Sequence, residues 1–215
     1  MSEAHEHTER EATVGTTRLE AFSDGVMAIV ITILVFTIEI PSGEPDLGAF
    51  LKEQWPSYVA FVTAFLMLGV WWVNHHELFR LIRKTTHGFL LVNVVFLMTV
   101  AVLPIPTQMV AKYLGRPGEH LALFVFGAVA TMAALAWNGL WFFALRRGLL
   151  YPDLGPERIR SYTRRTAMGA PTFLVGMVLA VESAPVSLAF YLVVVLFYML
   201  PSREPAVRPL SAPSA

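Results

Sequence analysis

The chain has 215 residues, of which 55% are hydrophobic and 15% charged, and its mean hydropathy is +0.58. A soluble protein carries about 25% charged residues, so this composition indicates a membrane protein. The net charge is zero and cysteine is absent, which excludes a basic nucleic-acid-binding surface, disulfide bonds and thiolate metal sites.

The two ends of the chain differ in composition from its middle. Residues 1–17 are polar, carry charges of both signs and lack the pattern of a signal peptide, so we expect a mobile cytosolic tail. Residues 202–215 belong to a stretch rich in proline, serine and alanine, for which we expect a disordered tail. Residues 18–201 are expected to form a single transmembrane channel domain without internal repeats.

Six apolar runs in this domain approach the roughly 20 residues that a membrane-spanning helix needs. We therefore predict an all-α membrane protein with six transmembrane helices per subunit. Pro104 and Pro106 are expected to kink or end the third run. Only residues 182–185 separate the last two runs, so a tight hairpin and a single re-entrant element are both open, and we favour the hairpin. The runs cover residues 19–40, 55–76, 88–111, 120–145, 164–183 and 185–201.

Lysine and arginine are unevenly distributed over the segments between these runs. With the N-terminus in the cytosol, only three of the 16 basic residues fall on the outer side: Lys52, Lys112 and Arg116. Cytosolic loops of membrane proteins carry an excess of Lys and Arg. The distribution therefore supports six spans with both termini in the cytosol. The first outer loop is acidic. An acidic loop attracts cations, but acidic outer loops also follow from the excess of Lys and Arg on the cytosolic side.

Ionisable side chains stand directly before the first apolar run. Arg18, Ser23 and Asp24 lie where the helix is expected to enter the membrane, and such groups are costly there unless they are paired or wetted. Ser23 or Asp24 would also serve as a helix N-cap, because an anion is favourable at a helix N-terminus. Capping and a functional role both remain open from this pattern.

One stripe of the first run contains the only polar side chain deep in it, Thr32. A threonine in a membrane helix usually donates to the carbonyl oxygen four residues earlier and has no further role. Alternatively, this stripe lines a pore as a narrow apolar ring, since hydrophobic constrictions gate channels by dewetting. Residues three and four positions apart share a helix face, and the stripe consists of Val26, Ile29, Thr32, Ile33 and Phe36.

The second run ends in Trp71-Trp72-Val73-Asn74-His75-His76-Glu77. An aromatic belt at the membrane interface explains the tryptophans. Adjacent residues on a helix point about 100° apart, so the two histidines are poorly placed to share one ion, and we expect no metal site. We expect instead that one histidine bonds to Ser23 or Asp24 and locks the first two helices together.

Two motifs together resemble the family of transmembrane protein 175, the endosomal and lysosomal potassium leak channel of animals and its prokaryotic homologues. The motifs are Arg18-x-x-x-Phe22-Ser23-Asp24 and Trp72-x-Asn74-His75-His76, and the resemblance covers residues 18 to about 200. Animal members carry two six-helix repeats, whereas this chain has one. The resemblance thus implies a prokaryotic multi-pass protein of the plasma membrane, which forms a homotetramer around a central pore lined by the first helix.

The resemblance also assigns roles to individual residues. It implies that Ile29 forms the tightest ring of the pore, with Thr32 beside it and further apolar rings at Ile33 and Phe36. Phe36 departs from the family, in which an aliphatic residue is more usual. The remaining motif residues are implied to form a network at the inner end of the pore: Arg18, Phe22, Ser23, Asp24, Trp72, Asn74, His75 and His76.

The function implied is passive, potassium-selective cation flux without a cofactor, a catalytic residue or a nucleic-acid partner. The partners are potassium ions, the lipid bilayer and three further copies of the chain. A proton-coupled secondary transporter, in which Asp24 and His76 relay protons, is the alternative. A membrane oxidoreductase with His75, His76 and His87 as haem ligands is a third class.

Overall fold

The computed structural model describes residues 2–39 and 46–199, with side chains from residue 16 onward. All elements in this part of the chain are helices, and one isolated β-bridge joins two connections. In chain order they are α1 (Ser2–Ile33), η1 (Leu34–Thr37), α2 (Leu47–Glu53), α3 (Trp55–Phe79), α4 (His87–Val102), α5 (Pro104–Tyr113), α6 (Glu119–Arg146), α7 (Pro156–Glu182) and α8 (Ala184–Met199).

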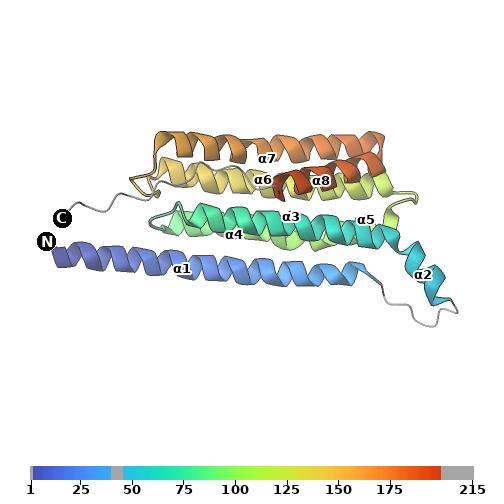
Figure 1. Ribbon diagram of the computed structural model, residues 1–215, viewed down its shortest axis with the longest axis horizontal. Coiled ribbons are helices and arrows are strands. Elements are labelled where there is room, and N and C mark those ends of the chain that lie inside the picture. Colours follow the sequence, from blue (N-terminus) through green and yellow to red (C-terminus); the bar gives the residue numbers. More distant parts are fainter. Residues whose placement is uncertain (1, 40–45, 200–215) are drawn as a thin grey trace, which may run out of the picture.

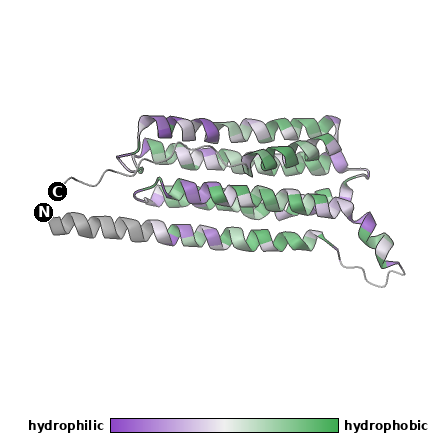
Figure 2. Ribbon diagram, viewed as in Figure 1, coloured by the Kyte–Doolittle hydropathy of each residue, from purple (hydrophilic) through white to green (hydrophobic). Residues whose placement is uncertain are grey.

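The long helices lie side by side along the longest axis of the molecule (Figure 1). The first helix, α1, forms one edge of the bundle and contacts α3 and α4, while α7 and α8 form the opposite edge and contact α6. Figure 2 shows hydrophobic residues along the middle of the helices and hydrophilic residues towards their ends, most clearly in the first turns of α7. This pattern is that of a helix bundle whose ends lie at a membrane boundary.

Four helical segments are long and apolar enough to cross a membrane: Thr16–Thr37, Trp55–Phe79, His87–Tyr113 and Glu119–Arg146. They correspond to the first four predicted spans. The fifth and sixth predicted spans fall on α7, whose first turns are charged, and on α8, which has only 16 residues. That these two helices also cross the membrane stays a prediction.

The last two helices form the hairpin that the sequence favours over a single re-entrant element. Only Ser183 separates α7 from α8, and the two helices pack against each other (Figure 1). Ser187 Oγ donates to the carbonyl oxygen of Gly176 at 2.7 Å. Tyr191 OH donates to the carbonyl oxygen of Phe173 at 3.1 Å. A Cβ atom at Gly176 would collide with the ring of Tyr191, so the close packing here requires glycine.

Two helical segments differ from the prediction, and a predicted break is confirmed. α1 begins at Ser2, so residues 2–17 continue the first helix where the sequence predicted a separate tail. α2 is a short helix in the first outer loop that the sequence did not predict. The third run breaks at Leu103, between α4 and α5, as Pro104 and Pro106 indicated. The predicted tail at residues 202–215 lies outside the described residues.

Most basic residues of the described chain gather at one end of the bundle, which we call the arginine-rich end. It comprises the start of the first span and the α3–α4 and α6–α7 connections (Figure 1). These two connections meet through the bridge between Ile82 and Leu150. The backbone N–H of Arg83 donates to Leu149 at 2.8 Å, and that of Tyr151 donates to Leu81 at 3.1 Å. Lys52, Lys112 and Arg116 lie at the opposite end, as the charge distribution predicted.

Candidate functional site: the first helix and its attachments

The face of α1 with the predicted pore residues is not covered by the rest of the described chain. Ile29 is 60% exposed, Phe36 is 73% exposed, and Thr32 and Ile33 are also exposed. The opposite face, with Met27 and Leu34, is completely buried in the core. We call Ile29, Thr32 and Ile33 of α1, together with Phe36 of η1, the open face of α1. An apolar surface of this kind is available to lipid or to another copy of the chain.

The hydroxyl group of Thr32 is bonded within its own helix. Its Oγ1 donates to the carbonyl oxygen of Ile29 at 2.8 Å, three residues earlier rather than the four that the sequence suggested. A hydroxyl has one hydrogen to donate and two acceptor lone pairs. Because the hydrogen is already used, the group presents an oxygen acceptor at the open face.

The first span tightens at its far end into the 3-10 helix η1. Residues three apart are eclipsed in a 3-10 helix, so Phe36 lies nearly in line with Ile33. Thr37 is buried, and its Oγ1 donates to the carbonyl oxygen of Leu34 at 2.8 Å. The helical period of 3.6 residues assumed in the sequence analysis did not reveal this change, although the stripe that it delimited is exposed in the structure.

A glutamine fixes the chain just beyond η1. Gln54 stands at the start of α3 and is 9% exposed. Its Nε2 donates to the carbonyl oxygen of Glu39 at 2.7 Å, and its Oε1 accepts from the backbone N–H of Glu39 at 2.9 Å. One side chain therefore satisfies both backbone groups of Glu39 and ties the end of the first span to α3.

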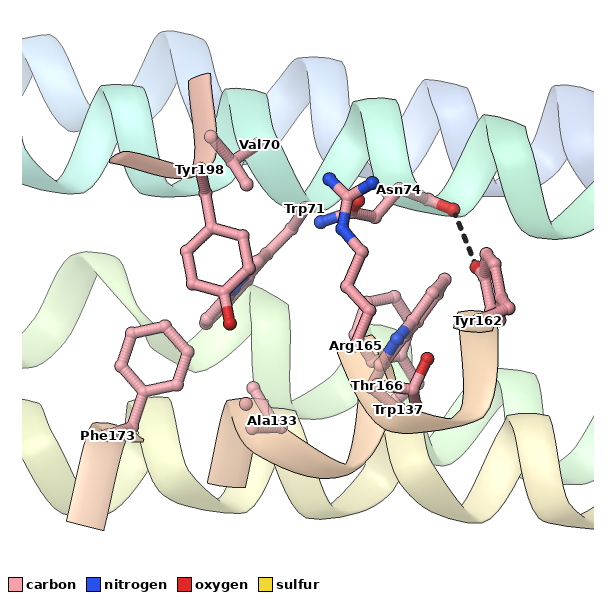
Figure 3. Close-up of a pocket in the computed structure, with 13 residues that line it drawn as sticks. Val70, Trp71, Asn74, Ala133, Trp137, Tyr162, Arg165, Thr166, Phe173 and Tyr198 are labelled. Carbon is pink, nitrogen blue, oxygen red and sulfur yellow. Dashed lines mark hydrogen bonds between the residues drawn. The ribbon is translucent and has the colours of Figure 1, made fainter. Parts of the chain in front are cut away.

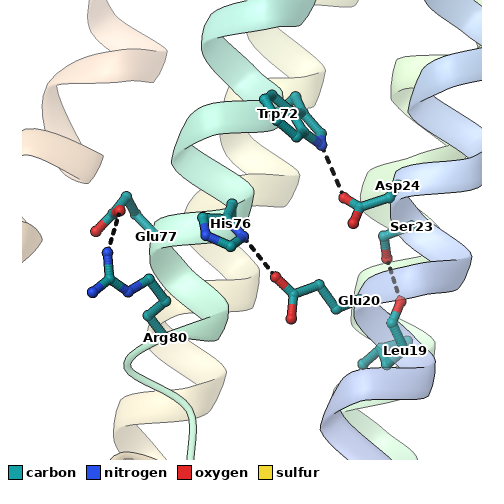
Figure 4. A network of polar contacts seen from close by, with 8 residues as sticks. All are labelled: Leu19, Glu20, Ser23, Asp24, Trp72, His76, Glu77 and Arg80. Carbon is teal, nitrogen blue, oxygen red and sulfur yellow. Dashed lines mark hydrogen bonds and ion pairs between the residues drawn. The ribbon is translucent and has the colours of Figure 1, made fainter.

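Towards the arginine-rich end, two side-chain pairs join α1 to α3 (Figure 4). Trp72 Nε1 donates to Asp24 Oδ1 at 2.9 Å, and His76 Nδ1 lies 2.8 Å from Glu20 Oε1. The prediction that a histidine would bond directly to Ser23 or Asp24 is wrong. The partner of His76 is Glu20, because α1 and α3 pack so that Trp72 faces Asp24 and His76 lies one turn further along.

A second, completely buried set of contacts joins three helices. Asn93 of α4 donates from Nδ2 to Ser23 Oγ at 2.9 Å, and its Oδ1 lies 3.1 Å from His75 Nε2. Ser23 in turn donates to the carbonyl oxygen of Leu19 at 2.9 Å. Ser23, His75 and Asn93 are all 0% exposed. Since Asn93 Oδ1 can only accept, His75 Nε2 carries the hydrogen.

The remaining atoms of His75 lie among aromatic rings. Its ring centroid is 4.5 Å from that of Phe79, 5.9 Å from Phe96 and 6.1 Å from Trp137. Its Nδ1 is buried without a hydrogen-bond partner in the described part of the chain. His75 therefore contacts Asn93 and aromatic rings in the core, whereas His76 pairs with Glu20 of α1. In residues 16–39 and 46–199 no three His, Cys, Asp or Glu side chains are grouped so as to hold a metal ion.

Three of the predicted network residues lie apart from these contacts. Arg18 is exposed and makes no hydrogen bond or ion pair with another described residue. Phe22 is 56% exposed. Asn74 uses its carbonyl oxygen to accept from Tyr162 OH at 3.4 Å, and it lines a cavity on the other side of α3.

The sequence analysis missed Glu20 as a member of the network, and it treated Asn93 as an isolated polar residue. A signal for Glu20 was present. Glu20 and Asp24 are four residues apart, as are Trp72 and His76, and residues at this spacing share a helix face. Two matched pairs on neighbouring helices therefore suggest two parallel contacts. Nothing in the sequence identifies α4 as the helix that carries the buried partner.

Comparison with known proteins places this arrangement in a family. The family model described as endosomal/lysosomal potassium channel TMEM175 matches residues 18–104, which contain the open face and both sets of contacts. A protein named as a potassium channel in Streptomyces collinus is 37% identical over 201 residues, covering 92% of this chain and 98% of the relative. The bovine endosomal/lysosomal proton channel TMEM175 is 32% identical over 139 residues, covering 60% of this chain and 29% of the relative.

The fold agrees with a solved structure. The crystal structure of a lysosomal potassium-selective channel TMEM175 homologue from Chamaesiphon minutus superposes with a TM-score of 0.79 at 34% sequence identity. The match covers 86% of this chain and 96% of that one. Sequence and fold thus agree over most of the length of both proteins, and the chain belongs to the TMEM175 family.

Proposed function

We propose that the chain is one subunit of a potassium-selective channel in the plasma membrane of a prokaryote, with both termini in the cytosol. In this proposal four copies assemble around a central axis and α1 of each lines the pore. The names of the Streptomyces relative and of the Chamaesiphon structure support potassium as the permeant ion. No catalytic activity and no cofactor are part of the proposal.

The observation that carries this proposal is the open face of α1. A helix at the edge of a bundle buries one face against its own chain, and α1 does so through Met27 and Leu34. Its opposite face combines branched aliphatic side chains with one oxygen acceptor at Thr32. Four such faces around an axis would form a narrow apolar constriction at Ile29, with further rings at Ile33 and Phe36.

Selection at such a constriction rests on the cost of dehydration. Isoleucine side chains cannot replace the water around an ion, in contrast to the carbonyl rings of ordinary potassium channels. Potassium sheds water more readily than sodium, so an apolar ring favours potassium. The Thr32 oxygens, whose hydrogens are held by the Ile29 carbonyl groups, offer acceptors one turn beyond the ring and offset part of the cost.

The contacts on the arginine-rich side of Ile29 set the position of this constriction. Ser23, Glu20 and Asp24 attach α1 to α3 and α4. Gln54 attaches the far end of the span to α3. We assign these residues a structural role, in which they fix the rotation of α1 and thereby the direction of its open face.

Flux measurements with a matched control test the proposal. In liposomes, purified protein should conduct potassium better than sodium, and Ile29→Asn should erode this preference because an amide lowers the dehydration cost for both ions. Ile105→Asn is the control, since Ile105 on α5 is 62% exposed and lies outside the proposed pore. Unchanged selectivity in Ile29→Asn, or equal loss in both variants, would remove Ile29 from the filter.

A proton-coupled transporter is the second candidate. The bovine relative is named a proton channel, which supports proton movement but not coupled transport, and the side chains of His76 and Glu20 are 52% and 26% exposed. Single-channel current steps would favour a pore. Saturating, counter-transported flux would favour a carrier.

A further inference from the structure

Two neighbouring cavities lie along α3 beside α7 and α8, and the larger one also reaches Trp72, which contacts α1. The smaller one, of about 60 Å³, is walled by α3, α6, α7 and α8 (Figure 3). The larger one, of about 370 Å³, runs along α3 and the end of α8. The cavities meet at four residues that line both: Val70, Asn74, Arg165 and Tyr198.

Arg165 is the one charged residue at this junction. Its guanidinium group points towards Asn74 (Figure 3), and it makes no hydrogen bond or ion pair with another residue of the described chain. The walls around it are largely apolar and aromatic, including Trp71, Phe173 and Tyr198. The junction therefore presents an uncompensated positive charge beside an apolar space.

The depth of this charge matches the boundary between headgroups and hydrocarbon. Arg165 lies nine positions after Pro156, which begins α7 at the arginine-rich end, or about 14 Å along the helix at 1.5 Å per residue. Asn74 lies five positions before Phe79, the last residue of the second span, or about 7 Å inside it. A charge at this depth is costly unless it reaches water or an anion.

We propose that the joined cavities bind one anionic phospholipid from the leaflet at the arginine-rich end. Its phosphate group would accept hydrogen bonds from Arg165 and from the amide of Asn74, because a guanidinium group binds phosphate in a fork of two donors. One acyl chain would occupy the larger cavity, whose floor along α3 consists of Phe65, Leu66, Gly69 and Val73. Basic pockets between transmembrane helices bind lipid headgroups in this way.

The apolar walls favour a lipid over free phosphate. An inorganic anion would fill only the surroundings of Arg165 and leave the larger cavity without an occupant, whereas an acyl chain buries apolar surface along its whole length. Gly69 provides room for this chain, since a Cβ atom there would meet no atom within 4 Å. A larger side chain at this position thus begins in open space along the groove.

The experiment is native mass spectrometry of the assembled full-length protein in detergent. Phosphatidylglycerol and phosphatidylcholine with identical acyl chains are added separately. We expect phosphatidylglycerol to be retained preferentially, by about tenfold, because both lipids carry a phosphate group but the trimethylammonium group of phosphatidylcholine cancels its charge and is repelled by Arg165. Arg165→Gln should abolish the preference. Arg164→Gln is the matched control, because Arg164 is the preceding residue on the same helix, is exposed as Arg165 is, and lines neither cavity.

The groove is tested separately by Gly69→Leu. This variant keeps Arg165, so reduced retention of phosphatidylglycerol in it supports an acyl chain along α3. Equal retention of both lipids by the unaltered protein, or equal loss in Arg164→Gln and Arg165→Gln, would overturn the proposal. So would displacement of the lipid by millimolar inorganic phosphate, or unchanged retention in Gly69→Leu. The readout does not involve ion flux, so it is independent of the proposed channel activity.

Discussion

Gln54 and Glu39 are joined by two hydrogen bonds between one side-chain amide and the two backbone groups of one residue. The side-chain amide of Gln54 thus satisfies both the N–H and the C=O of Glu39. These bonds lie just beyond η1, where the hydrogen bonds of the first span end. The direction in which the chain leaves η1 is therefore set by α3 rather than by η1 itself.

Gln54→Leu should destabilise the outer end of the first span. The substitution leaves the N–H and C=O of Glu39 without their partners, at a cost of about 1–3 kcal/mol for each group that stays buried. Thermal unfolding in detergent measures the loss. Gln108→Leu on α5 is the control, because Gln108 is exposed and makes no hydrogen bond through its side chain among the described residues. A similar melting temperature for both variants would show that the two bonds do not stabilise the fold.

Asn93→Leu should be among the most destabilising substitutions in the protein. It leaves His75 Nε2 without its acceptor and removes the donor to Ser23, and all three residues are fully buried. With about 1–3 kcal/mol for each unsatisfied buried group, we expect a loss of about 2–5 kcal/mol in unfolding free energy. Asn138→Leu on α6 provides the comparison: its Oδ1 is buried without a partner in the described chain, so this change should be neutral or stabilising. The reverse order of the two variants would contradict the role of Asn93.

Gly176→Ala should weaken the hairpin of α7 and α8. The added methyl group collides with the ring of Tyr191, and overpacking of this kind costs about 1–3 kcal/mol. Tyr191→Leu should partly restore stability in the double variant by making room. Gly139→Ala is the control on α6, because its Cβ would meet nothing within 4 Å and alanine favours a helix by about 0.5–1 kcal/mol. Melting temperatures should therefore move in opposite directions for the two alanine variants.

The pair of His76 and Glu20 should contribute little to stability. Their side chains are 52% and 26% exposed, and ion pairs between exposed groups contribute about 0.2–1 kcal/mol. A double-mutant cycle with Glu20→Gln and His76→Gln should thus give a coupling energy below about 1 kcal/mol. A coupling of several kcal/mol would show that the assembled protein buries this pair, for example between subunits.

Hydrophobic patterning and the positions of proline were sufficient to predict the first four spans and the break at Leu103. Helical period also delimited the stripe of α1 that the structure leaves exposed, without deciding whether it lines a pore. These features depend on length, on proline and on helical period, which are local properties of the sequence. The prediction for Thr32 was also local, and its hydroxyl is bonded within the helix as expected.

The partners across helices were less predictable. Whether His76 bonds to Asp24 or to Glu20 depends on the axial position of α3 relative to α1, because these partners lie one helical turn apart. Periodicity identifies which residues share a helix face but not the axial position of one helix against another. Asn93 could be recognised as polar, yet its role required knowing that α4 packs against both α1 and α3. The contact between Gln54 and Glu39 follows from the path of a loop, which no pattern in the sequence describes.

The backbone bonds between the α3–α4 and α6–α7 connections have a mechanical consequence. Each connection turns the chain around, and the bonds at Arg83 and Tyr151 join the two turns. The four helices that leave these turns are thereby coupled by backbone hydrogen bonds at the arginine-rich end. A tilt of α3 that keeps these bonds would therefore move the first turns of α7 with it, so that the two halves of the bundle would tilt together about this end.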